Sequence, residues 1–313
     1  MCNTLAPIIL FVFNRLEHTI NTLEALKKNI LAKDSNLIIY SDATNKKKDR
    51  IKVDQVRKYI SNLSGFKSIK VIKRKKNYGL AKSIKNGITQ VIYKYKKAII
   101  LEDDILTSKF FLSFMNDSLN FYKNNKKIWH INGWNYPNFE VNKNDIYADR
   151  MMNCWGWATW KDRWGKANFN VNEILNKFDK KKIYQFNLNN SENFYHHLKA
   201  NQKKEIKTWA VFWQATIFLN KGLCIRPNIS YTHNIGFDNS GVHCSYLMIN
   251  KYKNYRLNHK EKIKLINFKK ENTESIKSVM SFYKKNNVFY IRYLNKYYFH
   301  FRKLIEKNKK LFS

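Results

Sequence analysis

The chain has 313 residues, and its 59 lysines and arginines outnumber its 23 aspartates and glutamates, which gives a formal net charge of +36 at pH 7. A hydrophobic content of 44% excludes an intrinsically disordered protein, and the length suffices for one large domain or two small ones. The charge favours anionic partners, namely nucleotides, nucleic acid, acidic glycans or an anionic membrane surface. The four cysteines form no CxxC pair, so the sequence predicts a reducing compartment without a zinc site or a disulfide framework.

The first half of the chain is predicted to alternate strands with helices. The apolar run 7–13 is short and has no preceding lysine or arginine, so it is typical of a first strand rather than a signal peptide or membrane anchor. Further strands are expected at 37–40, 69–72, 97–101 and 128–132, and helices at 17–31, 49–63, 80–95 and 108–122. This alternation predicts an α/β fold, with a mostly parallel sheet flanked by helices.

Polar side chains follow three of these predicted strands. Arg15 follows the first strand, Asp42 the second, and the three acids 102–104 the fourth. Ligands of parallel sheets bind beyond the carboxyl ends of the strands, so these groups are expected at one binding edge. Carboxylates grouped there can hold a hard divalent cation, which in turn can hold a diphosphate. An acidic turn that caps the next helix is the alternative, but the coincidence of three strand ends favours the binding site.

The second half is less regular and rich in tryptophan. Trp155 and Trp157 flank Gly156, which permits close approach of a ligand, and tryptophan faces stack on sugars and bases. A substrate platform and a role in the core are both open for these two tryptophans. Asn135 follows Gly133-Trp134 and is a candidate for an acceptor-binding loop.

The C-terminal part of the chain differs in composition from the rest. Residues 251–313 contain eighteen lysines and arginines against four glutamates, interleaved with aromatic residues. The sequence therefore predicts a main domain over 1–250 and a basic, mainly helical extension over 251–313. One interpretation is an amphipathic segment on an anionic membrane surface. The other is a helix that packs its aromatic stripe on the domain.

Several short segments follow one another in a characteristic order and spacing, namely residues 11–15, 41–42, 77–80, 101–104 with 110–111, 129–135, 156–157, 224–227 and 234–243. Taken together, these segments resemble glycosyltransferases of the GT-A fold. The chain is similar to the bacterial HlpA-like sugar transferases and to animal N-acetylglucosaminyltransferase I over most of residues 5–250.

The resemblance implies a metal-dependent, inverting glycosyltransferase. Its donor is expected to be a UDP sugar, and its acceptor a bacterial surface glycan such as a lipooligosaccharide or capsule. Asp104 matches the direct ligand of Mn²⁺ or Mg²⁺, and Glu102 and Asp103 match the positions beside it, with Asp103 near the ribose or donor sugar. Arg15 and Asp42 match positions that hold the uridine.

The resemblance implies three further donor-binding residues but leaves the catalytic base open. Leu80 and Lys82 lie where the nucleotide pocket is closed, and His243 lies near the diphosphate. The family often carries the base inside a Trp-x-x-x-Trp stretch, and here residues 209–213 hold no acid. Glu205 and Asp238 are the candidate bases, with Glu205 slightly preferred, although a solvated helix residue is the alternative for Glu205.

Two functions of other classes compete with this interpretation. The charge and the aromatic content are compatible with a nucleic-acid-binding protein, but no nucleic-acid motif is present and no specific nucleic acid is expected. The missing acid is compatible with a catalytically inert homologue that binds glycans or partner enzymes. The expected location is the cytoplasm, with peripheral attachment to the inner face of the membrane as a separate hypothesis.

Overall fold

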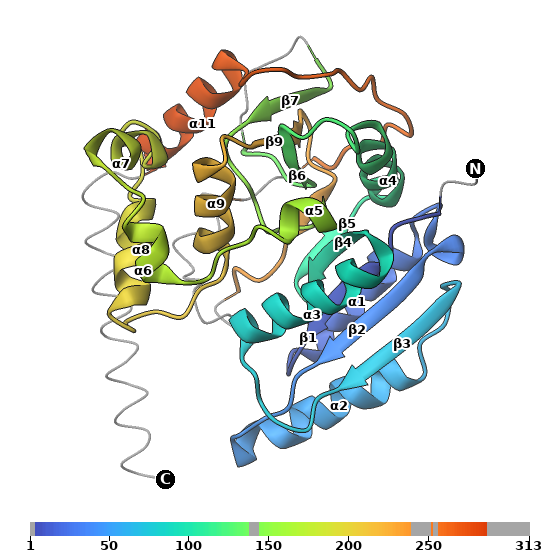
Figure 1. Ribbon diagram of the computed structural model, residues 1–313. Coiled ribbons are helices and arrows are strands. Elements are labelled where there is room, and N and C mark those ends of the chain that lie inside the picture. Colours follow the sequence, from blue (N-terminus) through green and yellow to red (C-terminus); the bar gives the residue numbers. More distant parts are fainter. Residues whose placement is uncertain (1–3, 138–143, 239–251, 253–255, 287–313) are drawn as a thin grey trace.

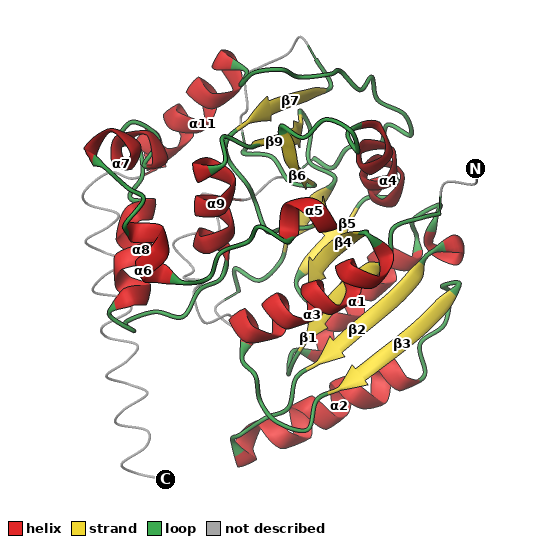
Figure 2. Ribbon diagram, in the orientation of Figure 1, coloured by secondary structure: helices red, strands yellow, loops and turns green. Residues whose placement is uncertain are grey.

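The computed structural model describes residues 4–137, 144–238, 252 and 256–286. Its main feature is an eight-stranded sheet in the order β3-β2-β1-β4-β8-β6-β9-β7, flanked by helices (Figures 1 and 2). The strands are β1 (Ile8–Val12), β2 (Asn36–Ser41), β3 (Ser68–Lys73), β4 (Lys97–Glu102), β6 (Ile128–Asn132), β7 (Ile146–Asp149), β8 (Trp157–Trp160) and β9 (Leu223–Pro227). This architecture confirms the predicted α/β fold class.

The first four strands form the parallel half of the sheet. Strand β1 pairs with β2 on one side and with β4 on the other, and β2 pairs with β3. The connecting helices are α1 (Leu16–Lys27), α2 (Arg50–Ser61) and α3 (Leu80–Tyr95), and α4 (Phe111–Phe121) follows β4. The five strands and four helices expected in the first half of the chain, including β6 outside this parallel group, are confirmed with ends that differ by a few residues.

Both faces of this sheet are covered, as the continuous apolar strands predicted. Ile8 and Leu10 pack into a hydrophobic cluster with residues of α1, α2 and α4. Ile9 and Phe11 point to the other face and pack against residues of α3, such as Ile88. Successive side chains of a strand alternate between faces, so a strand buried on both sides has no polar position.

The second half extends the sheet through antiparallel strands and a helical group. Strand β8 runs antiparallel to both β4 and β6, and β7 runs antiparallel to β9. The helices of this half are α5 (Lys161–Trp164), α6 (Val171–Leu175), α7 (Lys180–Phe186), α8 (Phe194–Gln202) and α9 (Ala210–Leu219). Helix α9 buries Trp213 completely against the sheet.

A small two-stranded sheet brings two distant parts of the chain together. Strand β5 (Ile105–Thr107) directly follows the three acids and pairs antiparallel with β10 (Thr232–Asn234). Asn234 is opposite Ile105 in this pairing, so the chain after β10 emerges beside the acids. The pairing is the reason that residues 234–238 belong to the same site as residues 102–104.

Residues 256–286 are packed onto the domain. Helix α11 (Thr273–Asn286) lies along β7 (Figure 1), and Ile276 and Val279 are buried with Trp134 and Tyr136. The preceding residues 256–272 are irregular, and the Ile266 carbonyl accepts a hydrogen bond from the Tyr122 hydroxyl. The boundary predicted at residue 250 lies outside the described residues. No helix within the described ranges is long and apolar enough to cross a membrane.

A buried ion pair anchors α11 to the sheet. Arg226 of β9 and Asp149 of β7 are completely buried, and Arg226 Nε lies 2.9 Å from Asp149 Oδ2. The Ser275 hydroxyl, on α11, donates to the same oxygen at 2.7 Å. Arg150 and Glu271 form a second pair at 2.7 Å between the same two regions. Residues 271–286 therefore supply polar partners to Asp149 and Arg150 at this end of the sheet.

Candidate active site

A compact group of charged side chains lies where β1 and β4 end. Phe11 of β1 is opposite Glu102 of β4, so the residues that follow both strands meet at one edge. Arg15 Nη2 donates hydrogen bonds to Asp103 and, at 2.9 Å, to Asp104 Oδ2. Arg15, Asp103 and Asp104 are mostly buried. We refer to Arg15 and the acids 102–104 as the acidic centre.

Burial and mutual repulsion control the charges of this centre. Burial raises the pKa of Asp103, while the adjacent guanidinium of Arg15 opposes that rise. The pKa of Glu102 is raised to about 8, first by burial and then by the neighbouring carboxylates Asp104 and Asp103. Burial and the like charges of the neighbouring carboxylates therefore disfavour the ionised form of Glu102.

The segment 234–238 lies against the acidic centre. The backbone N–H of Ile235 donates to the Asp104 carbonyl at 2.9 Å, and the N–H of Gly236 donates to Asn234 Oδ1 at 2.7 Å. A Cβ atom on Gly236 would overlap Asp104 Oδ2. Glycine is therefore the residue whose size lets the backbone approach this carboxylate.

Two side chains of the same segment attach it to other parts of the domain. Asp238 Oδ2 lies 3.1 Å from Nε2 of His18, which is on α1 one turn after Arg15. The ring of Phe237 packs edge-to-face on Trp155 at 5.5 Å and stacks on Tyr252 at 5.4 Å. The segment is therefore held by a carboxylate–imidazole contact on one side and by aromatic rings on the other.

Asp42 connects two loops at the neighbouring strand end. Its carboxylate accepts hydrogen bonds from the backbone N–H groups of Ala43 at 3.0 Å, Tyr78 at 3.0 Å and Gly79 at 2.9 Å. Tyr78 and Gly79 directly precede α3, where an anionic acceptor stabilises the unpaired N–H groups of the helix. Asp42 thus fixes the loop that leads into the first turn of α3.

The predicted pocket residues Leu80 and Lys82 lie in that first turn. Leu80 is half-exposed, and Lys82 Nζ lies 4.7 Å from the centre of the Tyr78 ring. Arg74 approaches the same ring at 4.1 Å. The structure therefore brings Asp42, Leu80 and Lys82 together beside an exposed aromatic ring held near two cations.

The acidic centre fits a divalent cation with few protein ligands. Among the described residues, no group of three or more histidine, cysteine or acidic side chains could by itself hold a metal. The Asp104 carboxylate is mostly buried there, and its Oδ2 occupies the position that a Cβ of Gly236 would take. Carboxylate oxygens suit Mn²⁺ and Mg²⁺, and such ions commonly complete their coordination with phosphate oxygens and water.

The predictions that Trp157 and Asn135 bind the acceptor are wrong. Trp157 is completely buried, stacked on Trp209 at 5.6 Å and on His130 at 4.8 Å. Asn135 is also completely buried, and its Nδ2 donates to the Asn228 carbonyl at 2.8 Å. Neither side chain is accessible to a ligand, because strand pairing and core packing enclose both.

Trp155 and Gly156, which were predicted to form a platform with Trp157, have different surroundings from it. Gly156 has a φ of +76°, its carbonyl accepts from the Gly133 N–H at 2.7 Å, and an added Cβ would lie 2.7 Å from Thr232 Cγ2. Gly156 is therefore required by the close approach of three strand ends. Trp155 is partly exposed and packs on Phe237, so of the predicted platform residues it is the one that contacts the 234–238 segment.

The two candidate bases lie in different surroundings. Glu205 is exposed in the turn after α8, where its backbone N–H donates to the Ala200 carbonyl at 2.9 Å. Asp238 contacts His18 on the helix that also carries Arg15 near its start. Of the two, Asp238 is the one that the structure joins to the surroundings of the acidic centre. His243, predicted near the diphosphate, lies outside the described residues.

Neither the contact of His18 with Asp238 nor the close approach of Gly236 to Asp104 was expected from the sequence. His18 follows Arg15 by three residues, and helical residues at that spacing share one face, so the spacing was a usable signal. The role of Gly236 depends on a neighbour far away in the chain, so no local pattern indicates it.

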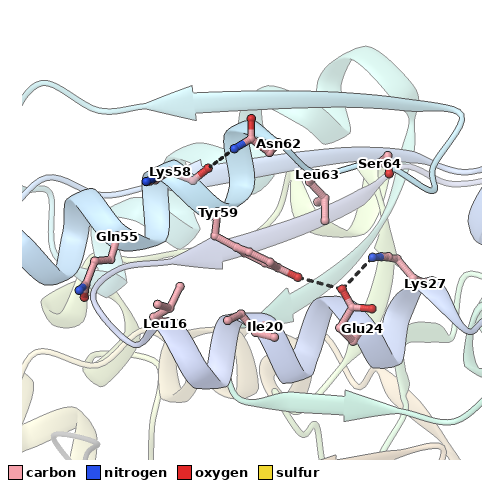
Figure 3. Close-up of a pocket in the computed structure, with 10 residues that line it drawn as sticks. All are labelled: Leu16, Ile20, Glu24, Lys27, Gln55, Lys58, Tyr59, Asn62, Leu63 and Ser64. Atoms are coloured by element: carbon pink, nitrogen blue, oxygen red, sulfur yellow. Dashed lines mark hydrogen bonds and ion pairs between the residues drawn. The ribbon is translucent and has the colours of Figure 1, made fainter.

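A separate groove lies between α1 and α2 (Figure 3), with a volume of about 400 Å³. Across the groove, Glu24 of α1 accepts a hydrogen bond from the Tyr59 hydroxyl of α2 at 2.9 Å. Glu24 also pairs with Lys27, on the same helix, at 2.7 Å. None of its ten lining residues is a predicted site residue, so it is not part of the candidate active site. They are Leu16, Ile20, Glu24, Lys27, Gln55, Lys58, Tyr59, Asn62, Leu63 and Ser64.

Comparison with known proteins gives one family match. Residues 2–168 match the model of the GNT-I family, which is more than half of the chain. No curated protein sequence matches the chain.

Two solved structures are similar over much of the chain. One is the mannosyltransferase PcManGT from Pyrobaculum calidifontis in complex with GDP-Man and Mn²⁺, with 10% identity, coverage of 69% of this chain and 71% of that chain, and a TM-score of 0.40. The other is S. aureus TarS 1-349, with 10% identity, coverage of 74% and 60%, and a TM-score of 0.42.

Proposed function

Because the chain belongs to the GNT-I family and is a glycosyltransferase, we propose a specific reaction for it. In that reaction the sugar of a UDP-sugar donor passes to a glycan acceptor with inversion at the anomeric carbon. The observation that carries the proposal is the acidic centre, in which Arg15 holds Asp103 and Asp104 together where β1 and β4 end. That edge is where ligands of parallel sheets bind.

The donor diphosphate would lie at the acidic centre. Asp104 would hold Mn²⁺ or Mg²⁺, and a cation there neutralises the charge that develops on the leaving diphosphate. Asp103 would face the ribose or the donor sugar, and Glu102 would support the two aspartates that follow it. Arg15 positions both carboxylates through its two hydrogen bonds and limits their mutual repulsion.

The nucleoside would lie toward α3. Asp42 orders the loop before that helix, and Leu80 and Tyr78 expose apolar surface beside it. Lys82 adds positive charge within the first turn of α3, where the helix N-terminus also favours an anion. We include His243 as a proposed contact of the diphosphate, on the family resemblance alone.

We propose Asp238, rather than Glu205, as the general base. In an inverting transfer a carboxylate takes the proton of the acceptor hydroxyl as that oxygen attacks the anomeric carbon. The Asp238 side chain is 46% exposed, so an acceptor can reach it, and its segment adjoins Asp104. Trp155, on the aromatic side of the same segment, would stack on the acceptor sugar.

Calorimetric titration of UDP with Mn²⁺ tests the metal and nucleotide part of this proposal. We expect Mn²⁺-dependent binding that Asp104→Asn abolishes, because the substitution removes the ligand charge with little change in shape. Asp54→Asn, an exposed carboxylate on α2, is the matched control and should bind like the wild type. Absence of UDP binding, or binding untouched by Asp104→Asn, would contradict the proposal. Random RNA that competes with UDP would favour the nucleic-acid alternative.

A donor-hydrolysis screen across nucleotide sugars tests whether the protein is catalytic. Release of free UDP from one donor would identify the sugar and argue against an inert homologue. Normal UDP affinity without hydrolysis or transfer would favour the inert homologue.

We further propose that the acceptor is a bacterial surface glycan, assembled at the cytoplasmic face of the membrane, and that basic residues of 251–313 contact anionic lipid. Because residues 256–286 pack on the domain, a truncation after Asn286 tests lipid binding by the following residues without removing that packing. The full chain should bind anionic vesicles and the truncated chain should not. Equal binding of the two chains would overturn this part of the proposal.

A further inference from the structure

We propose that His18 is a positioning residue of the transfer reaction, which orients the carboxylate of Asp238 toward the acceptor. The inference rests on the proposed function and adds a residue to it. His18 Nε2 lies 3.1 Å from Asp238 Oδ2, and the His18 side chain is mostly buried on α1. Its Nε2–H donates to the ionised carboxylate, because an ionised carboxylate only accepts hydrogen bonds.

The start of α1 contacts three carboxylates of the site, Asp103, Asp104 and Asp238. Arg15 stands directly before the helix and binds Asp103 and Asp104. His18 is three residues further and contacts Asp238, so the guanidinium and the imidazole lie on one face of the chain. The N–H of Thr19 and the hydroxyl of the same residue both donate to the Arg15 carbonyl, which fixes the geometry of this turn.

The contact with His18 ties Asp238 to a helix of the domain. Asp238 lies four residues after the end of β10, beyond the hydrogen bond from Ile235 to Asp104, and its own side chain is 46% exposed. An exposed carboxylate without a fixed partner samples several rotamers, and a base displaced by about 1 Å can lose roughly 10²-fold in rate. The contact with the mostly buried imidazole of His18 favours one rotamer of Asp238. The preceding residue, Phe237, packs on Trp155.

His18 takes no part in the bond changes or the proton transfer of the proposed reaction. The acceptor oxygen bonds to the anomeric carbon, the bond from that carbon to the diphosphate oxygen breaks, and the hydroxyl proton passes to Asp238. His18 keeps its proton throughout and touches neither sugar, so it acts through Asp238. A variant at His18 should therefore lower kcat and leave the donor KM nearly unchanged, because the donor contacts lie with the acidic centre and α3.

Kinetics of four variants test the inference in the full-length protein. We expect His18→Ala to lower kcat about 10- to 100-fold, as removal of an orienting partner typically does, and Asp238→Asn to lower it about 10²- to 10⁴-fold. His18→Gln should recover most of the loss, because its side-chain amide can donate to the same carboxylate. His18→Ala combined with Asp238→Asn should be no worse than Asp238→Asn alone, since the two residues act as a unit. His196→Ala, an exposed histidine on α8, is the matched control.

Hydrogen exchange provides a readout that does not depend on activity. In His18→Ala the amides of residues 235–238 should exchange faster, while α3 and the main sheet stay protected as in the wild type. Unchanged kcat and exchange in His18→Ala would overturn the inference, as would additive effects of the two substitutions or a His18→Gln variant as slow as His18→Ala. Failure of the wild type to bind Mn²⁺–UDP would instead overturn the proposed function, so the two failures are distinguishable.

Discussion

Arg15 Nη2 lies 2.9 Å from Asp104 Oδ2, and the same guanidinium binds Asp103, so one cation bridges two carboxylates of the acidic centre. The carboxylates raise the pKa of Arg15 and keep it charged, although its burial acts in the opposite direction. In this arrangement Arg15 supplies a positive charge at the place where a metal–diphosphate complex is proposed to bind.

Replacement of Arg15 by methionine should destabilise the protein by about 3 kcal/mol, because it leaves Asp103 buried without its charged partner. Mn²⁺ should raise the Tm of the variant more than that of the wild type, since the metal then replaces the missing charge. Thermal unfolding with and without Mn²⁺ measures both effects. Arg50→Met, an exposed arginine at the start of α2, should change neither. Equal Tm increases in the Arg15 variant and wild type would contradict the argument.

Gly236→Ala should weaken Mn²⁺-dependent UDP binding. The added methyl group overlaps Asp104 Oδ2, so either that carboxylate or the 234–238 segment must move. Overpacking of this kind costs about 1–3 kcal/mol, which corresponds to roughly 5- to 150-fold in affinity. Calorimetry measures the affinity, and a Tm within a few degrees of the wild type would localise the effect to the site. An affinity equal to that of the wild type would show that the site tolerates the methyl group.

Asp149→Asn should destabilise the fold far more than loss of an exposed ion pair. It leaves the completely buried guanidinium of Arg226 without its anionic partner, for an expected loss of about 3–5 kcal/mol. Glu24→Gln, which removes a partly exposed pair with Lys27, should cost less than about 1 kcal/mol. Urea unfolding of both variants gives the comparison. Similar losses would mean that Asp149 contributes little to the attachment of α11.

His130 should make stability fall at acidic pH. Its Nδ1 accepts from Trp213 Nε1 at 3.2 Å and its Nε2 lies 3.0 Å from the Asn153 carbonyl, so the ring is neutral with its proton on Nε2. Burial lowers its pKa to about 3. Between pH 3 and about 6.5 the unfolded chain therefore binds a proton that the folded protein excludes, and stability decreases as pH falls through this window.

His130→Gln isolates that contribution, because glutamine can supply one acceptor and one donor without titrating. The difference in unfolding free energy between wild type and variant should change with pH below about 6.5 and be constant above it. A difference that is constant from pH 4 to pH 8 would show that His130 is not the titrating group. The comparison is necessary because the raised pKa of Glu102 favours folding at lower pH, which is the opposite direction.

The parallel half of the fold was predictable from the sequence. Continuous apolar strands and helices with 3.6-residue periodicity are local patterns, and the acids 102–104 directly follow one of those strands. Parallel pairing then brings Arg15 and Asp104 to one edge, because β1 and β4 are neighbours that end at the same level. Hydrophobic periodicity thus determined both the fold class and the place of the acidic centre.

Only the tertiary structure decided which residues of the second half join that centre. Trp155 and Trp157 look alike in sequence, but the pairing of β8 with β4 and β6 buries Trp157 and leaves Trp155 against Phe237. Likewise, Asp238 approaches α1, and Glu205 remains in the exposed turn after α8, because β10 pairs with β5 beside the acids. Contacts between distant segments depend on strand register and core packing, which no local pattern of residues specifies.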